Sequence, residues 1–397
     1  MAWRSRIFIL VILACQLGLV YGLDTDGRVR GILFGDVVDQ YGGFNSYVII
    51  QTDPAIQATL VPTRPGYLGG RERAIRNLRI YMPRNYKTLV EGYDLILFSD
   101  ADRTVFTTEW IEWMRRGVEE RVGLLWLGSI GRKPSQIDLD WSITTLAEVI
   151  PARTSTEYYV YGVFRAVVED GEEALMGALP WESSPPLANL DLQIPREGSR
   201  VWATTDNPSR WPLMTYWEAG GSVLCFASKF PNGVMPWAEN WALFPQAMIY
   251  MVYRTAGREL PGDHLMFRRL TSHFTEYQTH SAILTSLLSF IDQFGGNVKR
   301  LYDEMDRIGE LKSEASALFL GEEYEESLGV MELARERQNE LIETGLEEKD
   351  RALLWIYVLE WCVVTSTFLL SGAVLWTLMV RRRLYSQVGQ TKFSSER

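Results

Sequence analysis

The sequence predicts an α/β protein with a mostly parallel sheet flanked by helices, followed by an all-α helical stalk and one C-terminal transmembrane helix. Three observations predict it. Short apolar runs alternate with amphipathic stretches up to about residue 262, a proline-free helical region follows, and an uncharged apolar run lies near the C-terminus. The expected parts are a signal peptide (1–22), the α/β domain (23–262), a helical stalk with a hairpin (263–352), the transmembrane helix (353–380) and a cytoplasmic tail (381–397).

Composition sets limits on both structure and function. The chain has 397 residues, of which 47% are hydrophobic and 12% aromatic, and this excludes disordered and fibrous classes. A formal net charge of -10 and the lack of a long basic block argue against binding to nucleic acid. Only three His and three Cys are present, so few residues can serve as a catalytic base or thiol nucleophile.

The N-terminus has the pattern of a secretory signal. Arg4 and Arg6 precede an apolar stretch over 7–20, and the small residue Gly22 suits cleavage. Cys15 follows Ile-Leu-Ala and faintly resembles a lipoprotein box, although apolar sequence continues beyond it. We expect export, with lipidation of Cys15 as the alternative to its being a residue of the signal core.

Strand and helix signals alternate in the α/β region. The predicted strands are 29–34, 58–61, 95–99, 123–127, 201–204 and 222–227. Residues 107–120 predict a helix, because Thr107 and Thr108 cap its start and apolar residues recur at helical spacing. The runs 95–99 and 123–127 are almost wholly apolar, which is typical of parallel strands covered on both faces.

Three helices are expected after Pro261-Gly262: residues 265–293, 297–320 and 322 onward, with glycines at 295, 296 and 321 marking the breaks. The middle helix has a coiled-coil seam whose members are Leu301, Met305, Ile308, Leu311, Ala315 and Leu318. Its expected partner is the next helix, folded back as a hairpin. No helix breaker separates Asp350 from the apolar run, so the third helix is expected to continue into the membrane segment.

The stalk carries the negative charge of the chain. Residues 300–350 hold 16 acidic and 6 basic residues, a balance that equals the net charge of the whole protein. A solvated helical face explains this pattern. An acidic docking surface or a cation-binding face is the alternative.

The run 361–380 contains 20 uncharged residues, enough to cross the hydrocarbon core of about 30 Å. Trp355, Tyr357 and Trp361 form an interfacial girdle at one end, and the cluster Arg381-Arg382-Arg383 at the other end predicts a cytoplasmic tail. The exported part then keeps Cys225 as its one cysteine and has no glycosylation sequon, which suggests a prokaryotic cell-surface protein.

Polar residues follow the predicted strands, where ligands bind in open parallel sheets. The ligand-binding candidates are Asp36, Asp100, Asp102, Arg103, Ser129 and Lys229. The alternative is that these residues cap helices and form turns. Similarly, the aromatic group Trp211, Trp217, Trp237, Trp241 and Phe244 would either floor a binding crevice or pack in the core.

No metal site or cofactor is expected. His273 and His280 lie seven residues apart, and therefore on one helix face, but no third ligand is near them in the sequence.

The segment Tyr93-Asp94-Leu95-Ile96-Leu97-Phe98-Ser99-Asp100, the later segment Gly123-Leu124-Leu125-Trp126-Leu127-Gly128-Ser129 and a glycine pair before the strand near residue 225 carry a resemblance. Together they resemble the class I glutamine amidotransferase-like superfamily, in particular its noncatalytic membrane-anchored members, over about residues 28–257. The resemblance implies a flavodoxin-like sheet.

The sequence departs from active members of that superfamily, which place a Cys on the turn after a central strand and use a His as base. Here that turn reads Leu127-Gly128-Ser129-Ile130-Gly131, and the first His is His264. Cys225 lies within a predicted strand, where we expect an inert core residue. We therefore expect no glutaminase activity, and a role in ligand binding or surface assembly.

An enzyme is the alternative function. Asp100-Ala101-Asp102-Arg103-Thr104 fits the Asp-x-Asp-x-Thr pattern of haloacid-dehalogenase-type phosphatases, so a magnesium-dependent hydrolase would use Asp100 and Asp102. No acidic pair follows Lys229 to complete its metal site. The expected partners are membrane lipid, through the C-terminal helix, and another surface or membrane protein.

Overall fold

A computed structural model describes residues 27–35, 46–128, 130–131, 140–228, 237, 240–294 and 298–393. The expected signal peptide, with Cys15, lies outside these residues. The chain folds into two compact units. One holds the described residues up to Thr275 together with Glu314–Met331, and the other holds Glu276–Ser313 and Glu332–Arg397.

The first unit is a mixed α/β structure built on an eight-stranded sheet with the strand order β2-β1-β3-β4-β10-β9-β8-β6. Its strands are β1 (Val29–Gly35), β2 (Ile56–Pro62), β3 (Leu95–Ser99), β4 (Gly123–Leu127), β6 (Ala166–Val168), β8 (Arg200–Thr205), β9 (Pro212–Glu218) and β10 (Ser222–Phe226). The strands from β2 to β10 pair in parallel, and β9, β8 and β6 extend the sheet in antiparallel fashion.

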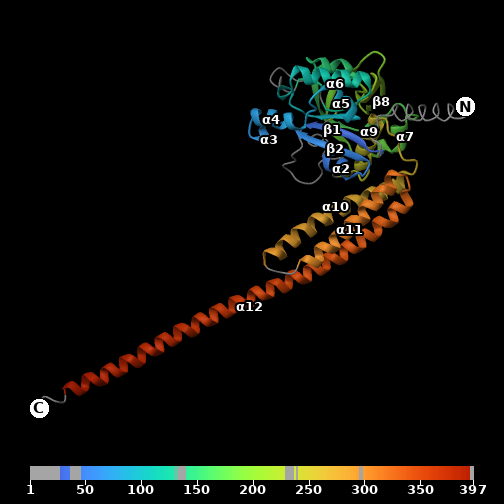
Figure 1. Cartoon of the computed structure of the whole chain (residues 1–397). Helices are drawn as coiled ribbons and strands as arrows, with labels where there is room; N and C mark the ends of the chain where they lie inside the picture. The colour runs from blue at the N-terminus through green and yellow to red at the C-terminus, as the bar shows by residue number, and fades with distance from the viewer. Residues whose placement is uncertain are drawn as a thin grey trace, which may run out of the picture. The chain divides into compact units, whose positions relative to one another are not determined.

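Helices cover both faces of the parallel strands (Figure 1). The helices of this unit are α2 (Ser46–Thr52), α3 (Pro65–Leu68), α4 (Arg71–Tyr81), α5 (Tyr86–Gly92), α6 (Thr108–Glu120), α7 (Ala174–Ala178) and α9 (Phe244–Ala256), with 3-10 helices η1 (Arg103–Val105), η3 (Thr145–Val149) and η4 (Trp181–Ser183). Ile96 and Leu124 pack into one core with α4 and α6, while α9 packs on β3, β4 and β10 from the other face. Because both faces are covered, every residue of β3 and β4 is buried.

The parallel strands lie where the sequence predicts them, but four other strands were not expected. These are β6, β9 and the separate antiparallel pair of β5 (Ala152–Phe164) and β7 (Leu187–Pro195). Polar residues such as Thr154, Gln193 and Thr215 interrupt the apolar pattern in three of these four. The predicted strand at 201–204 is present as β8, but it pairs antiparallel with its neighbours.

A glycine pair makes the turn from β9 to β10 possible. Gly220 has φ 111°, and a Cβ there would lie 1.8 Å from the carbonyl oxygen of Glu119. A Cβ on Gly221 would lie 2.2 Å from the carbonyl oxygen of Val122. The turn therefore approaches the end of α6 more closely than any side chain permits.

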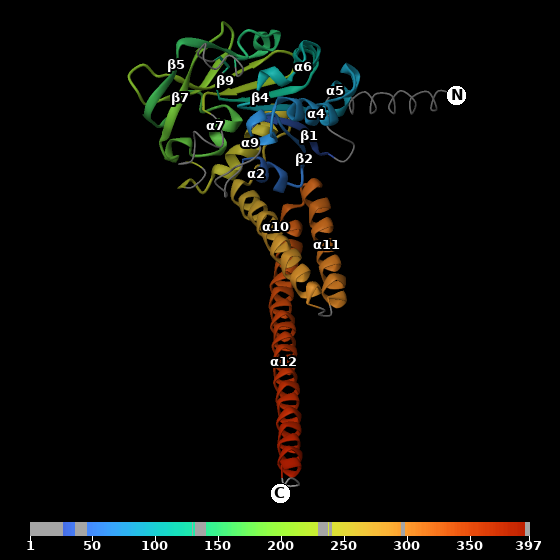
Figure 2. The same cartoon turned by 90° about the vertical axis from the view of Figure 1, so that its left-hand side faces the viewer.

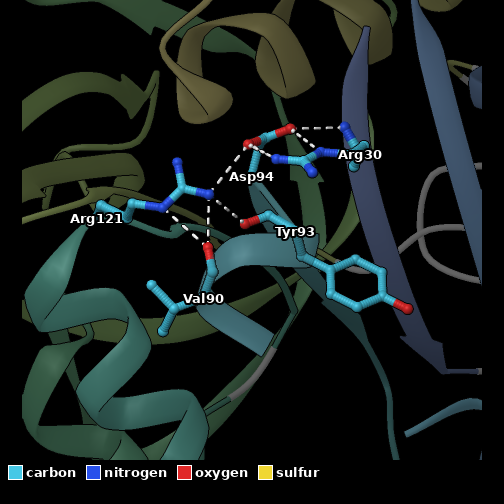
Figure 3. A network of polar contacts seen from close by, with 5 residues as sticks. All are labelled: Arg30, Val90, Tyr93, Asp94 and Arg121. Atoms are coloured by element: carbon cyan, nitrogen blue, oxygen red, sulfur yellow. Dashed lines mark hydrogen bonds and ion pairs between the residues drawn. The ribbon is translucent and has the colours of Figure 1, made fainter. Parts of the chain in front are cut away.

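Asp94 joins the amino ends of the central strands (Figure 3). Its carboxylate accepts hydrogen bonds from the backbone N–H of Arg30 at 3.0 Å and from the Arg30 guanidinium at 3.1 Å. Arg121, which ends α6, lies 3.5 Å from the same carboxylate and donates to the carbonyl oxygens of Val90 and Tyr93. The Asp94 side chain is only 2% exposed, so two cations compensate its charge in place of water.

A second buried carboxylate, Asp53, lies between α2 and β2. It accepts hydrogen bonds from the N–H of Ala55 at 2.8 Å and from the Tyr253 hydroxyl at 2.9 Å. Burial raises the pKa of Asp53 to about 6, although these hydrogen bonds and the charge of Arg258 act in the opposite direction.

Three long helices follow along the chain: α10 (His264–Gln293), α11 (Lys299–Leu320) and α12 (Tyr324–Phe393), each beginning within a few residues of its expected position. Residues 264–275, 314–320 and 324–331 of these helices belong to the first unit, and the rest of the three helices forms the second unit. In this unit Leu288 of α10, Ile308 of α11 and Leu341 of α12 share one apolar cluster. Of the six predicted seam residues, Leu301, Ile308 and Ala315 are buried. The other three, Met305, Leu311 and Leu318, are half-buried, and α10 adds a third helix to the expected hairpin.

Helix α12 continues without a break from the hairpin into the apolar segment (Figures 1 and 2). It has 70 residues, which corresponds to a length of about 105 Å at 1.5 Å per residue. Its most apolar 18-residue window has a mean hydropathy of 1.9 and no buried residue. Of the helices in the described ranges, α12 is the one long and apolar enough to cross a membrane.

Removal of the Asp94 carboxylate is expected to destabilise the α/β unit. Asp94→Ala leaves two partly buried guanidinium groups without their anion, and we expect the free energy of unfolding to fall by about 2–4 kcal/mol. Urea unfolding of the full chain in detergent, followed by near-UV circular dichroism, measures this change. The control is Glu91→Ala, which removes half of an exposed ion pair with Lys87 and should change stability by less than about 1 kcal/mol. Equal effects of the two substitutions would contradict the structural role of Asp94.

Asp53 is expected to make stability depend on pH. Its pKa is higher in the folded chain than the ordinary value of 3.8, so the folded state holds the proton more tightly. The resulting stabilisation is complete below pH 3.8 and is lost as the pH rises towards 6, by up to about 3 kcal/mol. Thermal unfolding between pH 4 and 7 should therefore show the wild type losing stability relative to Asp53→Asn as the pH rises. Replacement of the exposed Asp306 by Asn is the control, and a pH-independent difference between Asp53→Asn and the wild type would contradict the prediction.

Candidate functional site

The carboxyl ends of the parallel strands form one edge of the sheet. The register places Gly35 of β1 opposite Ser99 of β3, and Ser99 opposite Leu127 of β4. Residues that follow these strands therefore emerge together, at the edge where the sequence predicts a ligand.

An aromatic cluster fills one side of this edge. Phe34, Phe98 and Trp126 each precede the last residue of their strand. Phe106 and Trp141 pack against them, and neighbouring rings of the cluster have centroids 4.9–5.9 Å apart. Trp141 is 1% exposed and donates from Nε1 to the carbonyl oxygen of Ala101 at 2.9 Å. On this side, the position where ligands often bind in such sheets is occupied by the core.

Asp100 follows β3 and pairs with Arg64, which follows β2. The Arg64 guanidinium donates to the Asp100 carboxylate, and its Nε donates to the Asp100 carbonyl oxygen at 3.3 Å. The Asp100 carboxylate is 5% exposed, and its backbone has φ 56°, a conformation that Asp and Asn tolerate better than most residues. Arg64 was not expected at this site, because the predicted strand there ended three residues before it.

Asp102 and Arg103 lie in the turn after Asp100. The Asp102 carboxylate caps η1, accepting hydrogen bonds from the Thr104 N–H at 2.8 Å and from the Thr104 hydroxyl at 2.7 Å. This is the capping role that the sequence also allowed. Arg103 begins η1, and its Nε is buried without a hydrogen-bond partner.

Three of the six ligand-binding candidates, Asp36, Ser129 and Lys229, lie outside the described residues. The expected closeness of Asp100 and Ser129 therefore stays a prediction. Among the described candidates, the structure brings Asp100, Asp102 and Arg103 together on a single loop.

Cys225 lies in the core of the sheet. It is completely buried, and its thiol donates a hydrogen bond to the Gln193 side-chain oxygen at 3.3 Å. Burial raises the pKa of this thiol well above its ordinary value, which disfavours the nucleophilic thiolate. The Gln193 amide also donates to the carbonyl oxygen of Gly128 at 3.2 Å, so Gln193 links Cys225 to the residue after β4.

The described residues contain no group of three or more His, Cys, Asp and Glu side chains arranged to hold a metal ion. His273, one of the two His considered as ligands, is 6% exposed.

In the predicted aromatic group, Trp237, Trp241 and Phe244 are buried, with 4.9 Å between the Trp237 and Trp241 ring centroids. This confirms core packing for these three residues. Trp211 instead packs on Phe164, and Trp217 donates to the carbonyl oxygen of Val149 at 2.7 Å.

A cavity of about 320 Å³ lies beyond β4, between described residues of the segment 130–147 and the start of β5. Its lining residues are Ile130, Asp140, Ser142, Ala147, Ala152, Arg153, Thr154, Ser155 and Arg196. They come from the segment after β4, from η3, from the first strand residues of β5 and from the residue after β7. This cavity is the second component of the candidate site.

Positive charge dominates the walls of the cavity. Arg196 donates to the carbonyl oxygen of Ala147 at 2.8 Å, while its Nε is buried and lacks a hydrogen-bond partner. Burial lowers the pKa of Arg196, and the like charge of Arg153 lowers it further, against a weaker opposing effect from Glu148. The lining carboxylate, Asp140, accepts two hydrogen bonds from Ser142 through one of its oxygens.

Arg153, Thr154 and Arg196 were not among the predicted site residues. Arg153 and Thr154 begin β5 and Arg196 follows β7, and neither strand was predicted, so no rule about strand ends applied to these residues.

Comparison with known proteins gives similarity to solved structures alone. No protein-family model and no curated protein matches the sequence. The chain is similar to Cytoplasmic Protein STM1381 from Salmonella typhimurium LT2, at 18% identity and a TM-score of 0.46. It is also similar to Cytoplasmic Protein STM3548 from Salmonella typhimurium, at 15% identity and a TM-score of 0.45. Each match covers 57% of this chain and 99% of the other.

Proposed function

We propose that this chain is a single-pass membrane protein that presents a noncatalytic, amidotransferase-like α/β domain outside the cytoplasm for ligand binding or surface assembly. The order β2-β1-β3-β4-β10 of the parallel strands supports a flavodoxin-like sheet, because it is the 2-1-3-4-5 arrangement of that fold. The expected partners are membrane lipid and a second surface or membrane protein.

The observation that carries this proposal is the continuity of α12. The same helix contributes Ala334 and Leu341 to a buried cluster and, further along, exposes an apolar segment that includes Trp361 and Phe368. A segment of 20 uncharged residues that leaves large side chains such as these exposed has a favourable environment in lipid and an unfavourable one in water.

The proposed orientation rests on charge at the ends of the span. Trp355 and Trp361 lie at one end and suit a membrane interface, while Arg381, Arg382 and Arg383 follow the other end. Basic residues next to a span favour the cytoplasmic side, so the tail is assigned to the cytoplasm and the α/β domain to the outside.

The proposed noncatalytic role is supported by the contacts of the thiol and carboxylate groups that could otherwise act in catalysis. The Cys225 thiol is buried against Gln193, the Asp100 carboxylate pairs with Arg64, and the Asp102 carboxylate caps η1. A nucleophile or metal ligand must instead meet its substrate or metal directly. These contacts favour structural roles for all three residues and support binding over hydrolysis.

Protease treatment of intact cells tests anchorage and orientation. With one tag after Arg397 and an antibody against the α/β domain, we expect protease to remove the domain signal and to leave a protected fragment of the tail and span. Replacing the three arginines at 381–383 by glutamate should increase the fraction of chains with an accessible tail, whereas the same replacement at the remote Arg71, Arg73 and Arg76 should not. Digestion of the tag with protection of the domain would contradict the orientation.

A hydrolase assay on the same protein tests the noncatalytic role. We expect p-nitrophenyl phosphate turnover with magnesium to equal the background and to be unchanged in Asp100→Asn. Magnesium-dependent turnover that Asp100→Asn abolishes would replace the proposal with the phosphatase alternative.

A further inference from the structure

The cavity beyond β4 is lined by residues with polar side-chain atoms that lack hydrogen-bond partners within the described residues. Two unpaired atoms are buried in its lining residues: Nε of Arg196 and Oγ1 of Thr154, neither of which has a hydrogen-bond partner. A buried polar group without a partner costs roughly 1–3 kcal/mol, so such groups are uncommon without a reason. Here both belong to residues that line the same cavity.

The charges of the lining are also unbalanced. Within the part of the chain that the structure describes, neither Arg153 nor Arg196 forms an ion pair, and each guanidinium is close enough to oppose the charge of the other. Asp140 is the single lining carboxylate among the described residues, and one of its oxygens is engaged by Ser142. An anion in the cavity would relieve the repulsion between the two guanidinium groups.

Pairing of strands β5 and β7 brings Arg153, Thr154 and Arg196 together. Arg153 and Thr154 begin β5, which pairs with the end of β7, so that Arg153 lies opposite Ile194 and Arg196 follows two residues later. The backbone N–H of Arg196 donates to the carbonyl oxygen of Pro151 at 2.9 Å. This pairing fixes the two arginines at one end of the β5–β7 ribbon.

We propose that this cavity binds a small molecule through an oxyanion, a carboxylate or a phosphate, held between Arg153 and Arg196. The guanidinium fork matches both oxyanions in two-point hydrogen bonding, and the Thr154 and Ser155 hydroxyls lie in the same lining as further donors. The inference rests on the proposed binding function and names the chemical class of its ligand.

The cavity size limits the ligand. A volume of about 320 Å³ is at the lower end of small-molecule sites, so the part of the ligand held inside the cavity has the size of a compact metabolite. The apolar lining residues Ile130, Ala147 and Ala152 leave room for a short hydrocarbon part beside the oxyanion.

Isothermal titration of the full chain in detergent tests the proposal, with succinate as the carboxylate probe and inorganic phosphate as the phosphate probe. Chloride at matched ionic strength is the reference. We expect saturable binding of at least one probe, and a loss of affinity of about tenfold or more in Arg153→Gln and in Arg196→Gln, since each removes a charge-assisted hydrogen bond. Arg200→Gln is the matched control, because Arg200 is an exposed arginine outside the cavity, and it should leave the affinity within about twofold of the wild type.

Each outcome of the titration has a distinct meaning. Binding of succinate alone identifies a carboxylate ligand, and binding of phosphate alone identifies a phosphate ligand. Absence of saturable binding by both probes, or affinities that are the same in the wild type and both cavity variants, would overturn the proposal. Arg153 is exposed, so Arg153→Gln remains informative should Arg196→Gln fail to fold.

Failure here is distinguishable from failure of the proposed function. Protease accessibility on cells reports anchorage and orientation and does not depend on any ligand. If the protein is oriented as proposed but binds neither probe, the oxyanion ligand is ruled out and surface assembly stays as the proposed role. If a probe binds but the orientation is wrong, the oxyanion site stands and the cell-surface role is ruled out.

Discussion

The backbone hydrogen bonds of α12 must stay intact along the apolar segment if that segment lies in a membrane, and the rest of the structure is built around this constraint. In hydrocarbon no water is available for unpaired N–H and C=O groups, so an apolar span has to keep its helical hydrogen bonds along its whole length. Here the segment proposed to span the membrane is the continuation of a helix that starts at Tyr324. The glycines within it do not interrupt the helix, and one of them, Gly345, allows close contact: a Cβ there would lie 2.6 Å from Leu287 Cδ2. The packed part of α12 in the second unit and the apolar segment proposed to cross the membrane therefore belong to one helix.

In the α/β unit, buried charge serves architecture. Asp94 ties β1, β3 and the end of α6 together, Asp53 holds the turn before β2 against Tyr253, and Asp100 joins the residues that follow β2 and β3. Each carboxylate has specific partners, as buried charges require. The arginines of the cavity beyond β4 differ in lacking an anionic partner among the described residues. Two such guanidinium groups in the lining of one cavity are the feature on which the ligand proposal rests.

The pattern of apolar residues along the sequence predicts those strands and helices whose burial is set by their own residues. The parallel strands at 95–99 and 123–127 are apolar because helices cover both faces, and the helices after residue 262 are separated by glycines, so both were predictable. Strands β5, β7 and β9 were not, because partly polar strands of this kind are defined by pairing with distant segments rather than by their own pattern.

The candidate site also contains residues that the sequence predicts and residues that it does not. Asp100 and Asp102 were visible as residues after a strand, but the partner of Asp100, Arg64, and the pair Arg153 and Arg196 depend on contacts that no local pattern encodes.

Hydrogen–deuterium exchange of the full chain in lipid nanodiscs tests the continuity of α12 most directly. Residues 346–361 connect the packed part of the helix, which ends near the buried Ala352, to the apolar span. We predict that every amide in this stretch exchanges more slowly than an unstructured peptide, without a gap between the packed part and the span. A block of amides within 346–361 that exchanges at the unstructured rate would show a flexible linker, and would contradict the claim that one helix joins the folded chain to the membrane.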